Sequence, residues 1–325
     1  MIYMSKIFII AQKELKDILR SKIFIYVLLL LFGLTLVSLF VSELVFKDQV
    51  WQYNSSLEML RSIGKMPTTA APELFPLNLL RGVVDYIEII GAILGIFLGY
   101  ISMFKERNTK AIKLILTRPI KKNDIIFGKI LGNFIFTLVL MIGVVLLIIL
   151  TLPLVGGANL HFIDFVKLGI FIILSSLYIL IFFTLSFLLS LQQKVIANAL
   201  VISFAVWLVF VLILPQIGDT MDPDNQVPGG FFKSMALTKP QELKVMGNFK
   251  NYETIRTGVE QISITKHYER TVFALFGIKS NYNGKTLTEI FHDKWGNVLA
   301  VLLFLLIGIW ADIIFLRKSK NFLNI

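Results

Sequence analysis

The 325-residue chain is 56% hydrophobic and 16% charged, has a mean hydropathy of +0.77 and carries a formal net charge of +11. This composition is too apolar for an ordinary soluble domain and indicates an integral membrane protein. The basic residues gather just outside the apolar runs, as they do at the cytoplasmic ends of membrane spans, so the charge does not indicate a nucleic-acid partner. The absence of cysteine excludes disulfides, thiolate nucleophiles and zinc sites built on sulfur.

Residues 1–22 form a basic, amphipathic segment. Phe8, Ala11, Leu15 and Leu19 lie on one side of a helix, and Lys13, Lys16, Asp17 and Arg20 lie largely opposite. This pattern predicts a helix along the cytoplasmic membrane surface, although it is equally typical of a basic orientation signal. The apolar run that follows has no small-residue cleavage site, so we expect a retained span and not a signal peptide.

A helix that crosses the membrane needs about 20 mostly apolar residues. Six stretches meet this requirement: Ile23–Glu43, Val83–Phe104, Ile125–Pro153, Phe165–Leu191, Ile196–Pro215 and Val298–Leu316. They predict an all-α integral membrane protein of six transmembrane helices. Five of these helices lie in residues 23–216, and the sixth lies in residues 297–325 together with a basic cytoplasmic tail.

The distribution of lysine and arginine predicts how the spans are oriented. Basic residues are concentrated before the first span, in residues 105–124 between the second and third spans, and after the last span. Because positive residues favour the cytoplasmic side, we expect these segments and both termini in the cytoplasm. The short connection Gln192–Lys194 falls on the same side.

The loop of residues 154–164 has no basic residue, which fits the outside, and two longer external segments remain, residues 44–82 and residues 217–296. The longer one opens with a turn-rich stretch of Asp, Pro, Asn and Gly residues, which ends the fifth span. Apolar residues then recur at near-helical spacing, at Ile255, Val259 and Ile262 and again at Val272, Phe273 and Phe276. We expect one or two amphipathic helices in a small, partly helical external cap.

The second span carries Gly91, Gly95 and Gly99 on one face, four residues apart. This small-xxx-small spacing lets a neighbouring helix approach closely. The neighbour is either another helix of the same subunit, or a helix across a seam that moves or dimerises during transport.

Ionisable residues within the spans are few. Asp85 and Glu88 share a face in the first turns of the second span, where we interpret them mainly as interfacial anchors. Glu43 and Asp312 also lie near span ends, so the sequence gives little support to an ion-coupled transporter. The three histidines are dispersed, without the converging ligands that a metal site requires.

The segment between the second and third spans, FKERNTKAIKLILTRPIKKNDIIFGK (residues 104–129), has charged ends around a short apolar run. Residues 111–116 are too few to span, so we expect a cytoplasmic helix. Pro119 disfavours helix at the preceding residue, and Asn123 or Asp124 can cap the next span. A short cytoplasmic helix, a break at Pro119 and the start of the third span together form a rigid segment that could dock on a partner. The alternative is a polar loop with basic anchors.

This segment resembles the loop between the second and third helices of ABC-2 type permeases, the membrane subunits of a class of ATP-driven exporters. In that family an acidic, arginine-containing start leads through Gly-Thr into a leucine-rich run, a basic residue, proline and a final Gly-Lys. The matching positions are Glu106, Arg107, Leu114 to Leu116, Arg118, Pro119, Gly128 and Lys129. The family's Gly-Thr falls on Lys110 and Ala111, so we expect a more continuous helix here.

The resemblance implies a subunit that pairs with a second permease subunit, as a homodimer or heterodimer, and with ATP-binding cassette subunits in the plasma membrane of a prokaryote. No cofactor is expected in this chain, since it lacks the Walker A pattern and ATP and magnesium would bind the partner. Membrane lipid is the other expected partner, and nucleic acid is not expected. The implied coupling residues are Glu106, Arg107, Lys110, Ala111, Leu114, Arg118 and Pro119, with a smaller contact at Gln192 and Lys194.

Two other kinds of function are compatible with the sequence. One is a membrane scaffold or assembly factor whose external cap recruits an extracytoplasmic partner. The other is a membrane-embedded enzyme, which the lack of clustered catalytic residues and of a GxSxG elbow argues against. We therefore expect a transport subunit that is not itself an enzyme.

Overall fold

The computed structural model describes residues 2–62, 75–108, 121–156, 160–222, 231, 235, 239–248, 250–279 and 282–318. In these residues every regular element is helical, which confirms the predicted all-α class. The elements are α1 (Ile2–Leu19), α2 (Lys22–Ser62), η1 (Pro76–Leu80), α3 (Arg81–Tyr86), η2 (Ile87–Gly91), α4 (Ala92–Asn108), α6 (Lys122–Gly156), α7 (Phe162–Gln192), α8 (Ile196–Trp207), η3 (Leu208–Ile213), α9 (Leu214–Thr220), α11 (Lys239–Asn248), α12 (Lys250–Ile262), α13 (Ile264–Phe276) and α14 (Leu287–Lys318).

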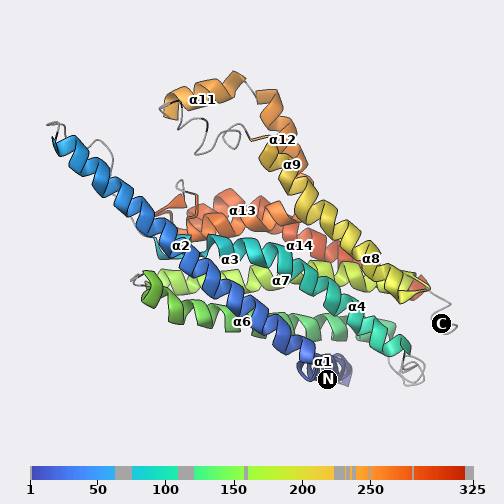
Figure 1. The fold of residues 1–325 in the computed structure, drawn as a ribbon. Helices are drawn as coiled ribbons and strands as arrows, with labels where there is room; N and C mark the ends of the chain where they lie inside the picture. Colours follow the sequence, from blue (N-terminus) through green and yellow to red (C-terminus); the bar gives the residue numbers. More distant parts are fainter. Residues whose placement is uncertain are drawn as a thin grey trace.

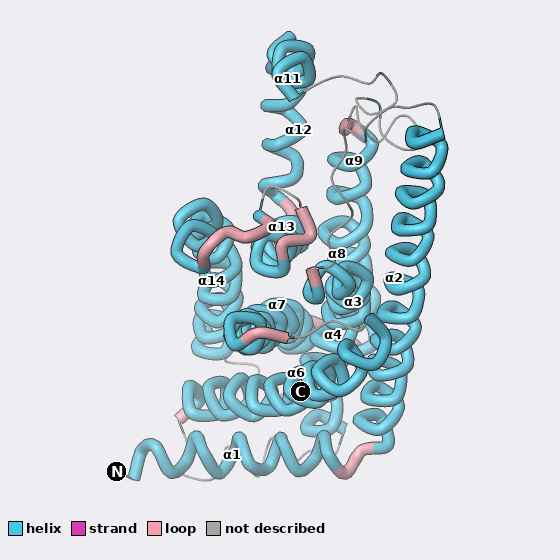
Figure 2. Tube along the Cα trace, turned by 90° about the vertical axis from the view of Figure 1, so that its left-hand side faces the viewer, coloured by secondary structure: helices cyan, strands magenta, loops and turns pink. Residues whose placement is uncertain are grey.

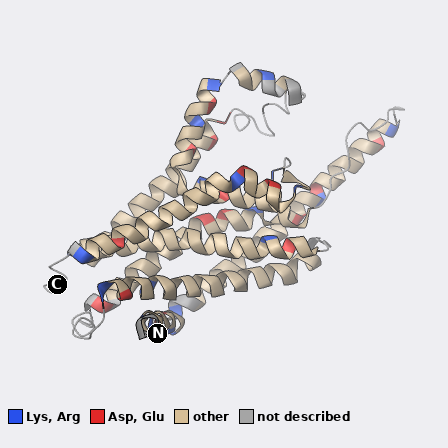
Figure 3. Ribbon diagram, turned by 180° about the vertical axis from the view of Figure 1, so that it is seen from behind, with Lys and Arg blue, Asp and Glu red and all other residues tan. Residues whose placement is uncertain are grey.

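Six helices in the described part of the chain are long and apolar enough to cross a membrane, as the sequence predicts. They are α2, the continuous run from η1 to α4, α6, α7, the run from α8 to α9, and α14. Lysine, arginine, aspartate and glutamate residues are sparse along the spans (Figure 3). The α7 helix lies at the centre, whereas α2, the α8–α9 run and α14 leave most of their apolar side chains uncovered.

Successive spans alternate in direction, so chain segments that are distant in sequence meet at the same end of the bundle. Figure 1 shows α1, the end of α4, the start of α6 and the end of α14 at one end, which we name the α1 end. The end of α7 and the start of α8 lie there as well. The first described helix, α1, and the end of the last one, α14, are therefore on the same side of the bundle.

The first span is longer than predicted. The α2 helix has 41 residues and continues past Glu43 to Ser62, so that its last part projects beyond the bundle (Figure 1). No glycine or proline interrupts residues 44–62, and Lys47 pairs with Glu43 one turn away at 2.6 Å. The length of an apolar run predicts which residues can cross the membrane. The helix itself continues until glycine, proline or another helix-breaking residue occurs in the sequence.

The segment between the fifth and sixth spans is partly helical, as predicted. Two amphipathic helices are present, α12 and α13, and Ser263 separates them by accepting a bond from the Lys266 backbone amide as an N-cap. The α12 helix runs back along α9, but α13 packs into the bundle against α7, α14 and α3 (Figure 2). Gly277 ends α13 in the left-handed conformation, with φ of 70°. Residues 264–276 are therefore part of the core.

Two spans contain a π-helical segment, η2 and η3, and each is bonded by a side-chain hydroxyl. Tyr178 Oη donates to the carbonyl oxygen of Glu88 in η2 at 2.8 Å. Ser263 Oγ donates to the carbonyl oxygen of Phe210 in η3 at 2.8 Å. A π-turn disturbs the regular helical ladder, and these hydroxyls supply donors that the helix itself does not. Both segments contact α13.

The glycine stripe of the second span faces α7 of the same chain. A Cβ atom added at Gly95 would lie 2.3 Å from the carbonyl oxygen of Ile179, and one at Gly99 would lie 2.4 Å from that of Phe183. At Gly91 the nearest atom is the Ile179 Cγ1, at 3.1 Å. The helices thus approach backbone to backbone, which only glycine permits.

We expect Gly95→Ala to lower the free energy of unfolding in detergent by about 1–3 kcal/mol, because the added methyl group cannot fit without separating α4 from α7. The control is Gly33→Ala in α2, where nothing lies within 4 Å of the added atom. That variant should be neutral or more stable, since alanine is favoured over glycine in helices. Equal stability of the two variants would contradict a close α4–α7 contact.

Candidate coupling site at the α1 end

The α1 helix packs closely beneath α6 (Figure 2). Two glycines of α6, Gly128 and Gly132, make this contact possible. A Cβ atom at Gly128 would lie 2.6 Å from the Ile10 Cβ, and one at Gly132 would lie 2.8 Å from the carbonyl oxygen of Ala11. Ala11 is buried, whereas Phe8 of the predicted apolar face is exposed. The helix therefore uses one side to pack on α6 and presents another to its surroundings.

A fully buried lysine lies where α1, α4 and α6 meet. The Nζ atom of Lys129 is 2.7 Å from Glu14 Oε1 in α1 and 2.9 Å from Glu106 Oε1 in α4. It also donates to the Oγ and carbonyl oxygen of Ser102, at 2.9 and 3.0 Å. Ser102 Oγ donates to the second Glu14 oxygen, and the more exposed Lys13 reaches Glu106 at 3.3 Å. We name Glu14, Ser102, Glu106 and Lys129 the coupling cluster.

The electrostatics of the coupling cluster depend on all three helices at once. Lys129 lies in α6, and each of its carboxylate partners comes from a different helix. A buried ion pair contributes little net stability, but removing one partner leaves an uncompensated charge in a poorly solvated place. The cluster therefore keeps α1, α4 and α6 in one fixed arrangement.

The space beside the coupling cluster is small. A cavity of about 30 Å³ adjoins it, lined by Lys13, Glu14, Asp17, Ile18, Ser21, Leu98, Ile101, Ser102 and Glu106. This volume has room for water and not for a cofactor or a transported molecule. The chemistry available here is charge pairing between helices.

Of the sequence-predicted coupling residues, the structure describes Glu106, Arg107, Gln192 and Lys194. Glu106 is buried in the coupling cluster, so its carboxylate faces the inside of the chain, and Arg107 follows it in α4. Gln192 ends α7 and Lys194 follows it, both exposed at the same end of the bundle. The remaining predicted residues, Lys110, Ala111, Leu114, Arg118 and Pro119, lie outside the described residues.

Sequence reasoning missed Glu14 and Ser102 and gave Lys129 no role. A signal was available for Lys129, because a lysine inside an apolar span is unusual and needs a partner in the protein interior. The partners themselves carry no signal, since Glu14 and Ser102 are distant in sequence and look like ordinary helix residues.

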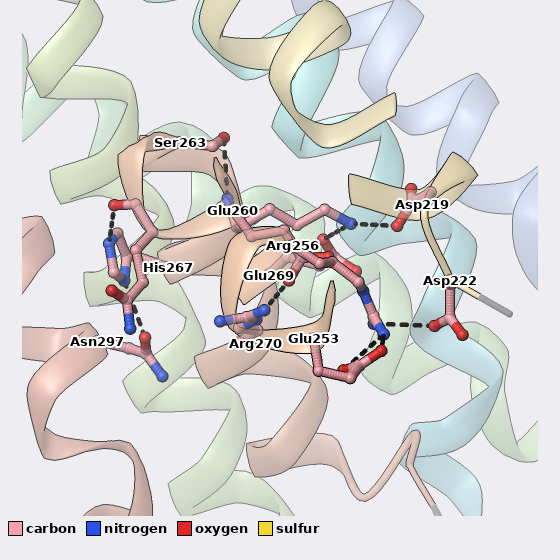
Figure 4. A network of polar contacts seen from close by, with 12 residues as sticks. Asp219, Asp222, Glu253, Arg256, Glu260, Ser263, His267, Glu269, Arg270 and Asn297 are labelled. Atoms are coloured by element: carbon pink, nitrogen blue, oxygen red, sulfur yellow. Dashed lines mark hydrogen bonds and ion pairs between the residues drawn. The ribbon is translucent and has the colours of Figure 1, made fainter. Parts of the chain in front are cut away.

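A second polar network joins α9, α12 and α13 near the other end of the bundle (Figure 4). Buried Glu260 pairs with Arg256 and Arg270, and Arg256 also reaches Asp222 at 2.8 Å. Lys266 lies 3.0 Å from Asp219 Oδ1 and 2.7 Å from Glu269 Oε2. Burial opposes its positive charge, but these two carboxylates outweigh burial and hold the pKa of Lys266 above its ordinary value. The network fastens α13 to α9 and α12.

His267 is a structural residue of α13. Its Nδ1 lies 2.8 Å from Asn297 Oδ1 and its Nε2 lies 2.9 Å from the carbonyl oxygen of Gln261, so both ring nitrogens are used within the chain (Figure 4). The described residues contain no group of three or more histidine, aspartate or glutamate side chains placed to hold a metal ion.

The chain matches the model of the family described as ABC-2 family transporter protein over residues 8–319. The match includes the coupling cluster, the glycine stripe and all six candidate spans. A comparison with curated proteins finds no match.

We expect Lys129→Met to lower the free energy of unfolding by about 3–5 kcal/mol, because two buried carboxylates would lose their cation. Lys13→Met is the matched control, since the Lys13 side chain is 47% exposed and should contribute at most about 1 kcal/mol. Adding Glu14→Gln and Glu106→Gln to Lys129→Met should recover stability. If the triple variant is no more stable than Lys129→Met, charge compensation is not what the lysine provides.

Proposed function

The chain belongs to the ABC-2 transporter family, and from that premise we propose that it is the permease subunit of an ATP-driven exporter that works with a separate ATP-binding subunit. The observation that carries this proposal is the coupling cluster. It joins the end of α4 and the beginning of α6, the two helices that flank the segment resembling the family's coupling loop, to the surface helix α1.

The proposed coupling runs from the partner to the bundle through rigid contacts. Closure of the ATP-binding subunits would push on residues 109–120. Glu106 and Lys129 fasten the two sides of this segment to each other and to Glu14, so the push moves α1, α4 and α6 together. The close α4–α7 contact at Gly95 and Gly99 then passes the movement to the central helix. Arg107, Leu114 and Arg118 are the proposed contacts with the partner.

The orientation follows from charge. With the α1 end in the cytoplasm, the basic residues around α1, at the start of α6 and after α14 lie on the side that positive residues favour. The Lys122 ammonium donates to the Leu316 carbonyl oxygen at 2.9 Å and so helps to bring the last span to the same end. Phe8 and Ile9 on the uncovered side of α1 suit it to lie in the membrane surface of a prokaryotic plasma membrane.

A second permease subunit completes the proposed pathway. Three spans of a single chain, α2, the α8–α9 run and α14, expose apolar side chains such as Leu36, Val201 and Leu306. Lipid covers part of this surface, and in the proposed dimer a second copy or a homologous chain covers the rest.

The absence of cysteine makes the dimer directly testable. Single cysteines at Leu36, Val201 and Leu306 should be oxidised in native membranes, and one of the three positions should yield a disulfide-linked dimer. A cysteine at Ser176 of α7, which is fully buried in the bundle, is the control that should stay monomeric. Monomer at all three exposed positions would contradict pairing through these faces.

The partner is tested by purification in mild detergent from the native membrane. We expect an ATP-binding subunit to co-purify and to hydrolyse ATP. The double variant Leu114→Asp with Arg118→Glu should reduce both the amount of co-purified subunit and the ATP hydrolysis by about tenfold. The reason is that Arg118→Glu reverses a charge and Leu114→Asp places a carboxylate in the proposed interface, and both changes oppose docking. Lys285→Glu, an exposed change far from the α1 end, should leave both intact. Recovery of the chain without any nucleotide-binding protein, even after crosslinking, would favour the membrane scaffold instead.

A further inference from the structure

Glu88 is a buried carboxyl group that the proposed coupling does not use. It lies in the π-helical segment η2, one turn after Asp85, and only 9% of the residue is exposed. Its Oε1 atom is buried and has no hydrogen-bond partner among the described residues. The sequence suggested an interfacial anchor here. In the structure, α13 returns into the bundle and covers the residue, so Glu88 is buried within the protein.

The hydroxyl groups of Tyr178 and Tyr268, which lie near Glu88, are bonded to groups other than its carboxylate. Tyr178 Oη donates its hydrogen to the backbone carbonyl of Glu88 and lies 3.2 Å from Thr265 Oγ1. The ring of Tyr178 stacks on that of Tyr268 with centroids 4.5 Å apart, and Tyr268 Oη bonds Ser175 Oγ at 2.8 Å. The two stacked rings close the site from the α7 and α13 sides, but neither phenol donates to the Glu88 carboxylate.

The charges around Glu88 leave it without a cation of its own. Glu269, Asp85 and Asp219 act on it with the same sign, and Lys266 acts with the opposite sign. The Lys266 ammonium is already held between Asp219 and Glu269. Arg81, the other nearby cation, acts on Asp85.

A buried carboxylate oxygen with neither a donor nor a cation is costly. Binding of a proton or a cation while α13 is in place would remove this cost at Glu88 Oε1. A metal ion needs several ligands, and the described residues hold no group of three or more acidic or histidine side chains that could supply them. A proton needs one carboxylate oxygen only, and Glu88 offers one.

We propose that Glu88 is a proton-binding site in the bundle, loaded while α13 covers it and released to water when α13 withdraws. In the covered state the proton is bonded to a carboxylate oxygen and the group is neutral. On withdrawal the O–H bond breaks, the proton goes to solvent and the carboxylate is hydrated. This site is separate from the coupling cluster and does not depend on the identity of the ATP-binding partner.

The sign of the pH effect follows from this cycle. The covered state binds one more proton than the open state, so acid favours seating of α13 and alkali favours its withdrawal. For one proton the ratio of open to covered states changes by at most about tenfold for each pH unit. Glu88→Gln mimics the neutral acid and should keep α13 seated at every pH.

The test measures labelling of α13 in the native cysteine-free chain. Ala274 is 1% exposed, so Ala274→Cys reports withdrawal through its reaction with a membrane-impermeant maleimide in vesicles. Because thiol reactivity itself rises with pH, the labelling rate at each pH is divided by the rate of the same reporter in Glu88→Gln. We expect this ratio to rise with pH by up to about tenfold per unit. Asp85→Asn, which removes the neighbouring carboxyl group, should leave the rise intact.

A ratio that stays flat with pH would overturn the proposal. So would a ratio that changes with sodium or potassium at fixed pH and ionic strength, since that result would assign the site to a metal cation. A second measurement needs no reporter cysteine. The infrared carbonyl band of protonated carboxyl groups should persist above pH 6, where exposed glutamates with a pKa of about 4.3 are ionised. Glu88→Gln should lose part of this band, and an unchanged band would also overturn the proposal.

Discussion

Lys129 imposes the arrangement on which the rest of the α1 end depends. An ammonium group inside an apolar helix can exist only if other helices bring it oxygen atoms, and here Glu14, Ser102 and Glu106 do so from α1 and α4. Together these contacts fix α1 and α4 relative to α6. The glycines Gly128 and Gly132 are the steric counterpart, because α1 can place Glu14 beside the lysine only where α6 has no side chains in the way.

The same logic extends through the bundle by close helix contacts. Lipid offers no hydrophobic drive for one helix to bury its apolar surface against another, so intimate packing and polar bonds must hold the spans together. Gly95 and Gly99 bring α4 onto the backbone of α7, and α4 also carries Ser102 and Glu106 into the coupling cluster. The α4 helix thus connects the coupling cluster to the central helix α7. A rigid connection of this kind is what a coupling element requires.

The sequence predicts the spans well because length and hydropathy alone determine whether a helix can cross a membrane. It predicts less where the result depends on tertiary contacts. Both α12 and α13 show an amphipathic period, so periodicity alone does not distinguish α12, which projects, from the more apolar α13, which is buried against α7, α14 and α3. The extension of α2 past Glu43 was missed for a different reason, since hydropathy reports where the apolar run ends and not where the helix ends. The family resemblance included Glu106 and Lys129 of the coupling cluster, but it did not predict that they form an ion pair. The two residues are more than 20 positions apart, and a contact at that separation produces no periodic pattern in the sequence.

Buried acidic groups have opposite consequences at different places in this bundle. Glu14 and Glu106 share a lysine, so their charges are satisfied in one arrangement only and that arrangement is held firmly. Glu88 has no such partner among the described residues, and neither carboxylate oxygen of Asp312 in α14 has a hydrogen-bond donor there. A group of the second kind is stable only while it is neutral, so its cover can leave more readily when the proton leaves. The coupling cluster at the α1 end is therefore suited to transmit movement, because its charges are fixed in one arrangement. The Glu88 carboxyl group beneath α13 is suited to respond to that movement, because it can be neutralised by a proton.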